Sequence, residues 1–131
     1  RNKRDIEFKT HVDWNETHVL MKVAFPAEIL SRTATYEIQF GNIERSTHES
    51  TASDRARFEV TAHKWVDLSE GNYGVSLLND CKYGFDVHDS VMRISLLRSP
   101  TSPRSTCRRG VAQVHLQPLS PWPGAGRTPT L

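Results

Sequence analysis

The 131-residue sequence lacks the features that mark several classes of protein. It has only two cysteines, Cys81 and Cys107, so it can form at most one disulfide and is not a disulfide-stapled scaffold. Cys107 stands among Pro, Ser and Arg residues, which favours free thiols and a reduced, cytoplasmic setting. The longest apolar run, residues 75–78, is far shorter than the roughly 20 residues that cross a bilayer, so we expect no membrane partner.

Catalytic motifs are also missing, because the chain has no nucleophile elbow, phosphate-binding loop or CxxC pair. His11 and Asp13 share one face of a predicted strand, but a zinc site needs three or four ligands. Asp86 and Asp89 are close enough in sequence for acid–base chemistry, although loop carboxylates are more often simply solvated. Short motifs alone therefore indicate no reaction.

Charge is unevenly distributed along the chain, which carries a net charge of +2. Residues 104–131 hold four arginines and no acid, so residues 1–103 have a net charge of −2. No basic face is available to neutralise a phosphate backbone, and we expect no nucleic-acid partner. The sequence opens on Arg1 without a secretory signal, which is typical of a processed product or a fragment.

Apolar and polar residues alternate with the period of half-buried β-strands over residues 6–14, 19–25, 34–40, 57–62 and 92–97. Residues 75–78 form a further, central strand, and the first two runs are predicted to pair as a hairpin. Residues 44–55 and 85–89 are polar and predict surface loops, and a helix is conceivable only within residues 54–60. The pattern predicts an all-β, antiparallel β-sandwich-like domain. The side chains expected in its core are Trp14, Phe25, Tyr36, Phe40, Phe58 and Leu77.

The alternation disappears from residue 104 onward, where Pro, Ser, Thr, Arg and Gly dominate. This composition predicts a domain over residues 1–103 followed by an irregular, disordered tail over residues 104–131.

Several blocks of residues 5–103, in colinear order, resemble the C-terminal β-domain of glycoside hydrolase family 38 α-mannosidases of the cytosolic and bacterial type. The matching blocks are residues 12–16, 21–26, 34–41, 57–60, 63–70, 73–84 and 96–100. Many long blocks at coherent spacing are far more specific than one short motif.

The resemblance implies part of a retaining α-mannosidase that hydrolyses terminal α-D-mannosides and uses zinc or another divalent metal. It also implies that the metal ligands and the aspartate nucleophile belong to a missing N-terminal catalytic domain, so this fragment binds no metal and is inactive alone. The implied substrate of the full enzyme is a mannose-containing oligosaccharide. Four residues are candidates for supporting the substrate pocket: His48, Asp80, Lys82 and Tyr83. The loop after His48 departs from the family pattern, which has Asn and Trp in place of Ser50 and Ser53.

The resemblance and the alternation both end at Pro103, which predicts that the tail is a frameshift product, real or through sequencing error. Codons for residues 103–117 exist that, read one nucleotide later, give PDPRADEGLHRFTYS. The resemblance implies a continuation of this kind, acidic first and then a His-x-Phe-x-Tyr strand. A genuine linker is the alternative.

Two functional hypotheses remain open at this point. The first is the mannosidase fragment, and the second is a free-standing carbohydrate-binding or adaptor β-sandwich. A binding module needs an exposed aromatic platform, whereas most aromatic residues here fall on positions predicted to face inward, which favours the fragment.

Overall fold

The computed structural model describes residues 6–71, 73–100 and 110–119, the last range by its backbone. The described elements are β1 (Phe8–Trp14), β2 (Leu20–Pro26), β3 (Thr33–Ile38), β4 (Gly41–Ser46), α1 (Ala52–Arg55), β5 (Val60–Thr61), β6 (Trp65–Glu70), β7 (Tyr73–Asn79), β8 (Gly84–His88), β9 (Val91–Arg98) and β10 (Gly110–Leu119). Within the described ranges, no helix combines the length and apolar character that a membrane crossing requires.

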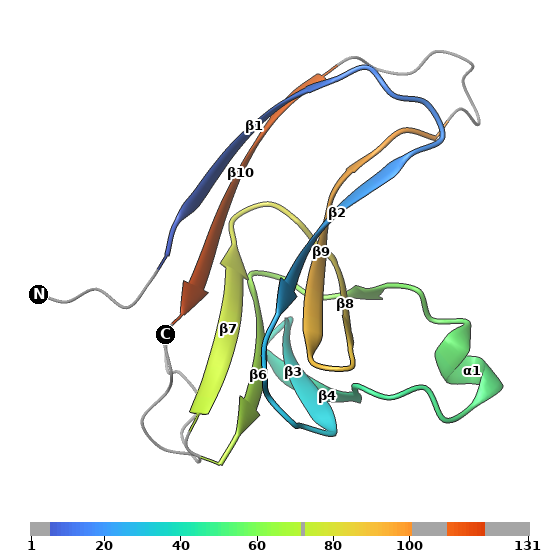
Figure 1. Cartoon of the computed structure of the whole chain (residues 1–131), viewed down its shortest axis with the longest axis vertical. Coiled ribbons are helices and arrows are strands. Elements are labelled where there is room, and N and C mark those ends of the chain that lie inside the picture. Colours follow the sequence, from blue (N-terminus) through green and yellow to red (C-terminus); the bar gives the residue numbers. More distant parts are fainter. Residues whose placement is uncertain (1–5, 72, 101–109, 120–131) are drawn as a thin grey trace, which may run out of the picture.

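The strands form two antiparallel sheets that pack as layers of a β-sandwich (Figure 1). One sheet has six strands in the order β1-β10-β7-β6-β3-β4, and the other has four in the order β2-β9-β8-β5. The predicted all-β, antiparallel sandwich is therefore confirmed.

A single apolar core fills the space between the sheets. The six-stranded sheet contributes Ala34, Tyr36, Val66, Leu68 and Leu77, and the four-stranded sheet contributes Phe85, Val87, Met92, Ile94 and Leu96. Inward residues alternate with outward ones, as in Met92, Ile94 and Leu96 of β9, because successive side chains of a strand point to opposite faces. Four of the six side chains expected in the core lie there or pack against it: Tyr36 and Leu77 are core, Trp14 is buried, and Phe25 is half-buried.

The prediction is wrong for Phe40 and Phe58, which are 110% and 80% exposed. Phe40 lies in the turn between β3 and β4 with a φ of 60°, so the strand alternation ends before it. Phe58 precedes β5, which is only two residues long and does not extend the pairing back to it.

The predicted hairpin of the first two strands is also wrong, because β1 pairs with β10 and β2 pairs with β9. The polar turn after Trp14 carries the chain from one sheet to the other. Two backbone hydrogen bonds fix the start of β2 beside the end of β9, from His18 N to Ser99 O at 2.8 Å and from Ser99 N to Val19 O at 3.0 Å.

Two segments predicted as loops contain strands. Residues 41–46 form the edge strand β4, and residues 84–88 form β8. β4 is an edge strand, and nearly all of its side chains are exposed, so apolar residues do not recur along it with the period of a strand. The described residues include one helical turn, α1, which overlaps the first two residues of the segment 54–60 in which a helix was conceivable and starts with a capping box between Thr51 and Asp54.

The tail also departs from expectation, because residues 110–119 form β10 between β1 and β7. The prediction of an irregular tail is therefore wrong for residues 110–119. The rest of the predicted tail, residues 104–109 and 120–131, lies outside the described residues. The domain boundary near residue 103 stays a prediction.

A frameshift after Pro103 likewise remains a prediction, and the nucleotide sequence of the gene decides it. We expect a shifted frame across residues 103–117 that encodes an acidic stretch and then an alternating strand. An uninterrupted frame with unrelated codons would contradict the prediction.

The burial pattern predicts opposite outcomes for two substitutions. Leu77→Ala should lower the free energy of unfolding by about 2–5 kcal/mol, since it opens a cavity at a side chain that is 1% exposed. Phe40→Gly should change it by less than about 1 kcal/mol or raise it, because glycine accepts the positive φ that Phe40 adopts. Urea unfolding of both variants measures the difference, and a larger loss from Phe40→Gly would contradict the assigned burial.

Candidate functional site

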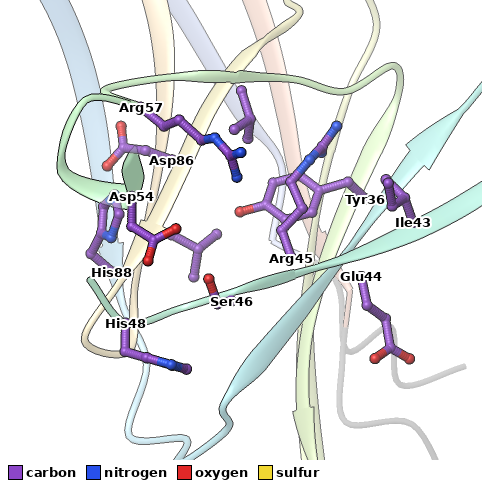
Figure 2. A pocket seen from close by; sticks show the side chains of 12 residues that line it. Tyr36, Ile43, Glu44, Arg45, Ser46, His48, Asp54, Arg57, Asp86 and His88 are labelled. Carbon is purple, nitrogen blue, oxygen red and sulfur yellow. The ribbon is translucent and has the colours of Figure 1, made fainter. Parts of the chain in front are cut away.

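A pocket of about 390 Å³ opens at one edge of the sandwich, where β4 faces β8 and the α1 segment (Figure 2). Tyr36 and Arg45 line it from the six-stranded sheet, and Val60, Asp86 and His88 line it from the other sheet. The segment that connects the sheets adds His48, Asp54 and Arg57. The pocket exists because β4 and β5 are edge strands, so no further strand closes the space beside them.

Tyr36 and Arg45 form the inner wall of this pocket. In the β3–β4 hairpin, Arg45 stands opposite Ala34 and therefore faces inward, with its guanidinium carbon 4.6 Å from the centre of the Tyr36 ring. Tyr36 is 2% exposed, and this burial, partly offset by Arg45 and reinforced by Asp86, raises its pKa to about 12. The hydroxyl is therefore a neutral donor at physiological pH.

The outer wall is the segment from Thr47 to Arg57, which is anchored to the sandwich at Thr47 and ordered internally at α1. Buried Thr47 donates its backbone N–H to Arg32 O at 3.0 Å and its hydroxyl to Ser31 O at 2.6 Å. In α1, the Asp54 carboxylate accepts from the backbone N–H of Thr51 at 3.0 Å and from its hydroxyl at 2.8 Å. Both bonds reach Oδ2 of the carboxylate, and they hold the Asp54 pKa below its ordinary value.

A cluster of charged side chains lies behind the pocket, on the outer face of the four-stranded sheet. Asp86 is 6% exposed and accepts from Lys22 at 2.7 Å and from Arg93 at 2.8 Å. Lys22 also lies 3.2 Å from Glu59, which accepts from the Ser95 hydroxyl. Burial lowers the Lys22 pKa, but the hydrogen bonds to Asp86 and Glu59 outweigh it and the pKa rises overall.

This cluster ties three strands together and makes Asp86 a poor catalytic acid or base, because both of its oxygens are bonded to cations. Asp89, considered with it as a possible acid–base pair, is exposed in the turn between β8 and β9. The cluster could have been foreseen: a two-residue turn at Asp89 and Ser90 sets Asp86 opposite Arg93. That inference requires recognising β8 as a strand.

The four residues predicted to support a substrate pocket lie in two places. His48 lines the pocket, next to Thr47, whose carbonyl accepts from Asp89 N just beyond the end of β8. Asp80, Lys82 and Tyr83 belong to the β7–β8 loop, at the other end of β8. The structure does not bring the two groups together, and their role in a substrate pocket stays a prediction.

The β7–β8 loop is ordered by Asn79, which is buried at the end of β7. Its side-chain oxygen accepts from the backbone N–H groups of Cys81 and Lys82, and its amide donates to His63 O at 3.2 Å. The Tyr83 ring packs edge-on against His63, with 5.8 Å between ring centres. The loop therefore presents a fixed shape, with Asp80 and Tyr83 exposed to solvent.

A metal centre is not found in the described part of the chain. No three His, Cys, Asp or Glu side chains there are placed to hold a metal ion together, so the zinc implied by the resemblance is assigned to none of these residues. The pocket offers guanidinium, hydroxyl and imidazole groups, which bind polar ligands by hydrogen bonds.

Comparison with known proteins gives a family match over most of the chain. Residues 1–106 match the glycosyl hydrolases family 38 C-terminal domain. The chain is 53% identical to human alpha-mannosidase 2C1 over 105 residues, which is 80% of this chain and 10% of that protein. It is 53% identical to Dictyostelium discoideum alpha-mannosidase G over 109 residues and 46% identical to a Saccharomyces cerevisiae alpha-mannosidase over 110 residues, in both cases 83% of this chain and 10% of the relative. The chain thus spans about a tenth of the length of these relatives.

The buried tyrosine of the pocket predicts a loss of stability at alkaline pH. The unfolded chain ionises Tyr36 near pH 10, whereas the folded chain holds the proton until about pH 12, so the free energy of unfolding should fall as the pH rises between these values. The part due to Tyr36 is about 2 kcal/mol, and Tyr36→Phe should remove it. Urea unfolding across this pH range measures the slope.

Tyr73→Phe is the matched control, since Tyr73 is 45% exposed in the same sheet and the variant retains Tyr36. It should keep the wild-type slope. An unchanged slope in Tyr36→Phe would show that other groups cause the alkaline loss.

Proposed function

Because the chain belongs to the family of glycosyl hydrolases family 38 C-terminal domains, we propose that it is part of an α-mannosidase that hydrolyses terminal α-D-mannosides with retention of configuration. The observation that carries the proposal is the family match over residues 1–106, with about half of the aligned residues identical to named alpha-mannosidases. The substrate we propose for the full enzyme is a mannose-containing oligosaccharide, and its proposed location is the cytoplasm.

The chemistry of the reaction belongs, in this proposal, to a catalytic domain upstream of the chain. Retaining hydrolysis needs two carboxyl groups about 5 Å apart, one as nucleophile and one as acid and base. Both oxygens of Asp86 are bonded to cations, Lys22 and Arg93, so this carboxylate is not available for that role, and Asp54 serves as the cap of α1. Zinc, which would hold sugar hydroxyls in such an enzyme, is proposed for the same upstream domain.

The proposed contribution of this chain is a rigid scaffold that presents loops to the catalytic domain. The sandwich fixes the ends of its strands, and binding residues are commonly found on loops held by such scaffolds. His48 at the pocket and Asp80, Lys82 and Tyr83 in the β7–β8 loop are the side chains we propose to support the substrate pocket. The observation that supports this role is their position in segments that hydrogen bonds fix at the two ends of β8.

A free-standing carbohydrate-binding module is the second candidate, and one observation favours it. Phe40, Phe58 and Tyr83 are 110%, 80% and 55% exposed, although the first two were expected in the core. Exposed aromatic rings are the usual stacking surface for sugars in binding modules.

The chain on its own should not hydrolyse mannosides. With an aryl α-mannoside as substrate and added zinc or cobalt, we expect release of the aryl group at the rate of the protein-free blank. Turnover above that blank would contradict the assignment of the chemistry to another domain.

The same preparation separates the two candidates. Retention on a mannan column, lost in Phe58→Ala and Tyr83→Ala, would support a binding module, and absence of retention favours the scaffold role.

A further inference from the structure

The edge pocket contains two arginines that form no ion pair with the carboxylates of the described residues. Arg45 has one terminal nitrogen, Nη1, that is buried and has no hydrogen-bond partner in the part of the chain that the structure describes. Arg57 also lines the pocket and forms no ion pair with a carboxylate of the described residues, although its charge acts on Asp54 and is one of the smaller causes of the lowered Asp54 pKa. Burying an unpaired donor of a charged group is costly, so a site of this kind favours an acceptor.

The acidic residues that line the pocket do not supply that acceptor. Asp86 is bonded to Lys22 and Arg93, and Asp54 is held by Thr51 in the capping box. The Glu44 side chain is exposed and points away from the middle of the pocket (Figure 2). The two arginines of the lining are therefore not ion-paired with any of these three carboxylates.

Neutral hydroxyl groups add to these cations. The Tyr36 hydroxyl is directed into the pocket, as is the charged guanidinium of Arg57, and Ser46 also belongs to the lining (Figure 2). His48 and His88 also belong to the lining, with His88 Nδ1 at 3.7 Å from Glu49. A volume of about 390 Å³ is ample for a small anion with bound water.

We propose that this pocket binds an oxyanion, of the phosphate or carboxylate class, between Arg45 and Arg57. The planar fork of an arginine matches two oxygens of such a group, and bonds between charged partners are stronger than neutral ones. The site goes beyond the proposed mannosidase role, because it requires neither a mannoside nor the catalytic domain.

A competing explanation assigns Arg45 a purely structural role. An inward-pointing charge on an edge strand discourages pairing with another chain, and β4 is such a strand. In that case Arg45 would matter for association of the protein but no anion would bind.

The test uses the full chain with inorganic phosphate as the probe. We expect phosphorus NMR to show saturable line broadening on addition of protein, and the thermal midpoint to rise further in phosphate than in sodium chloride of equal ionic strength. Phosphate also stabilises proteins by exclusion from their surface, so saturation and dependence on the two arginines are the decisive features. Arg45→Met and Arg57→Met should each weaken binding about tenfold or more.

Arg98→Met is the matched control, since Arg98 is exposed at the far end of β9 and does not line the pocket. It should bind phosphate as the wild type does. Arg57 is exposed, so its variant should fold even if Arg45→Met does not. Competition by acetate shows whether a carboxylate is accepted in the same place.

Binding that only acetate shows still supports an oxyanion site and identifies a carboxylate as its ligand. Absence of saturable binding by both anions, or equal weakening in Arg98→Met, would overturn the proposal. Because no mannoside is present, neither result bears on the proposed hydrolase role.

Discussion

The apolar layer between the two sheets is the constraint on which the rest of the structure depends. Each inner strand has one face for this layer, and Val66, Leu77 and Ile94 show almost no exposure there. Hydrophobic burial is worth about 25 cal/mol per Å² of apolar surface, so the burial of these side chains between the sheets is the main contribution that stabilises the fold. Charged side chains are consequently confined to the outer faces, the turns and the open edge of the sandwich.

The charged features follow from that division. On the outer face of the four-stranded sheet, Asp86 of β8 is neutralised by Lys22 of β2 and Arg93 of β9. At the open edge, Arg45 points inward because it stands opposite buried Ala34, and no further strand closes the space beside β4. In the cluster, Asp86 is paired with both cations, whereas Arg45 Nη1 has no hydrogen-bond partner among the described residues. This difference is why the edge pocket, rather than the ionic cluster, is the place to seek a ligand.

Much of the fold could be predicted from the alternation of residues, and the rest depended on contacts between distant segments. Strands β1, β2, β3, β7 and β9 were recognised in whole or in part, whereas β6 was not predicted. The partner of β1 could not be read locally, because it lies about a hundred residues further along the chain. β8 was missed because Asp86 resembles a loop acid until its two cations are seen. Phe40 was misplaced since periodicity does not reveal the positive φ that ends the strand.

The candidate site was less predictable than the fold. His48 was identified through a family resemblance, but Tyr36, Arg45 and Arg57 were not connected with it, since the pocket needs β4 to be an edge strand that faces β8. Sequence spacing carries no information about which segments meet across two layers. Electrostatic partners such as Lys22 and Asp86, 64 positions apart, are hidden for the same reason.

Hydrogen exchange of the backbone amides tests the central claim, that one apolar layer organises the chain, most directly. The account predicts the slowest exchange in β6, β7 and β9, whose inward side chains fill the core, and fast exchange in residues 47–59 around α1. Uniformly fast exchange, or stronger protection of residues 47–59 than of β9, would contradict it.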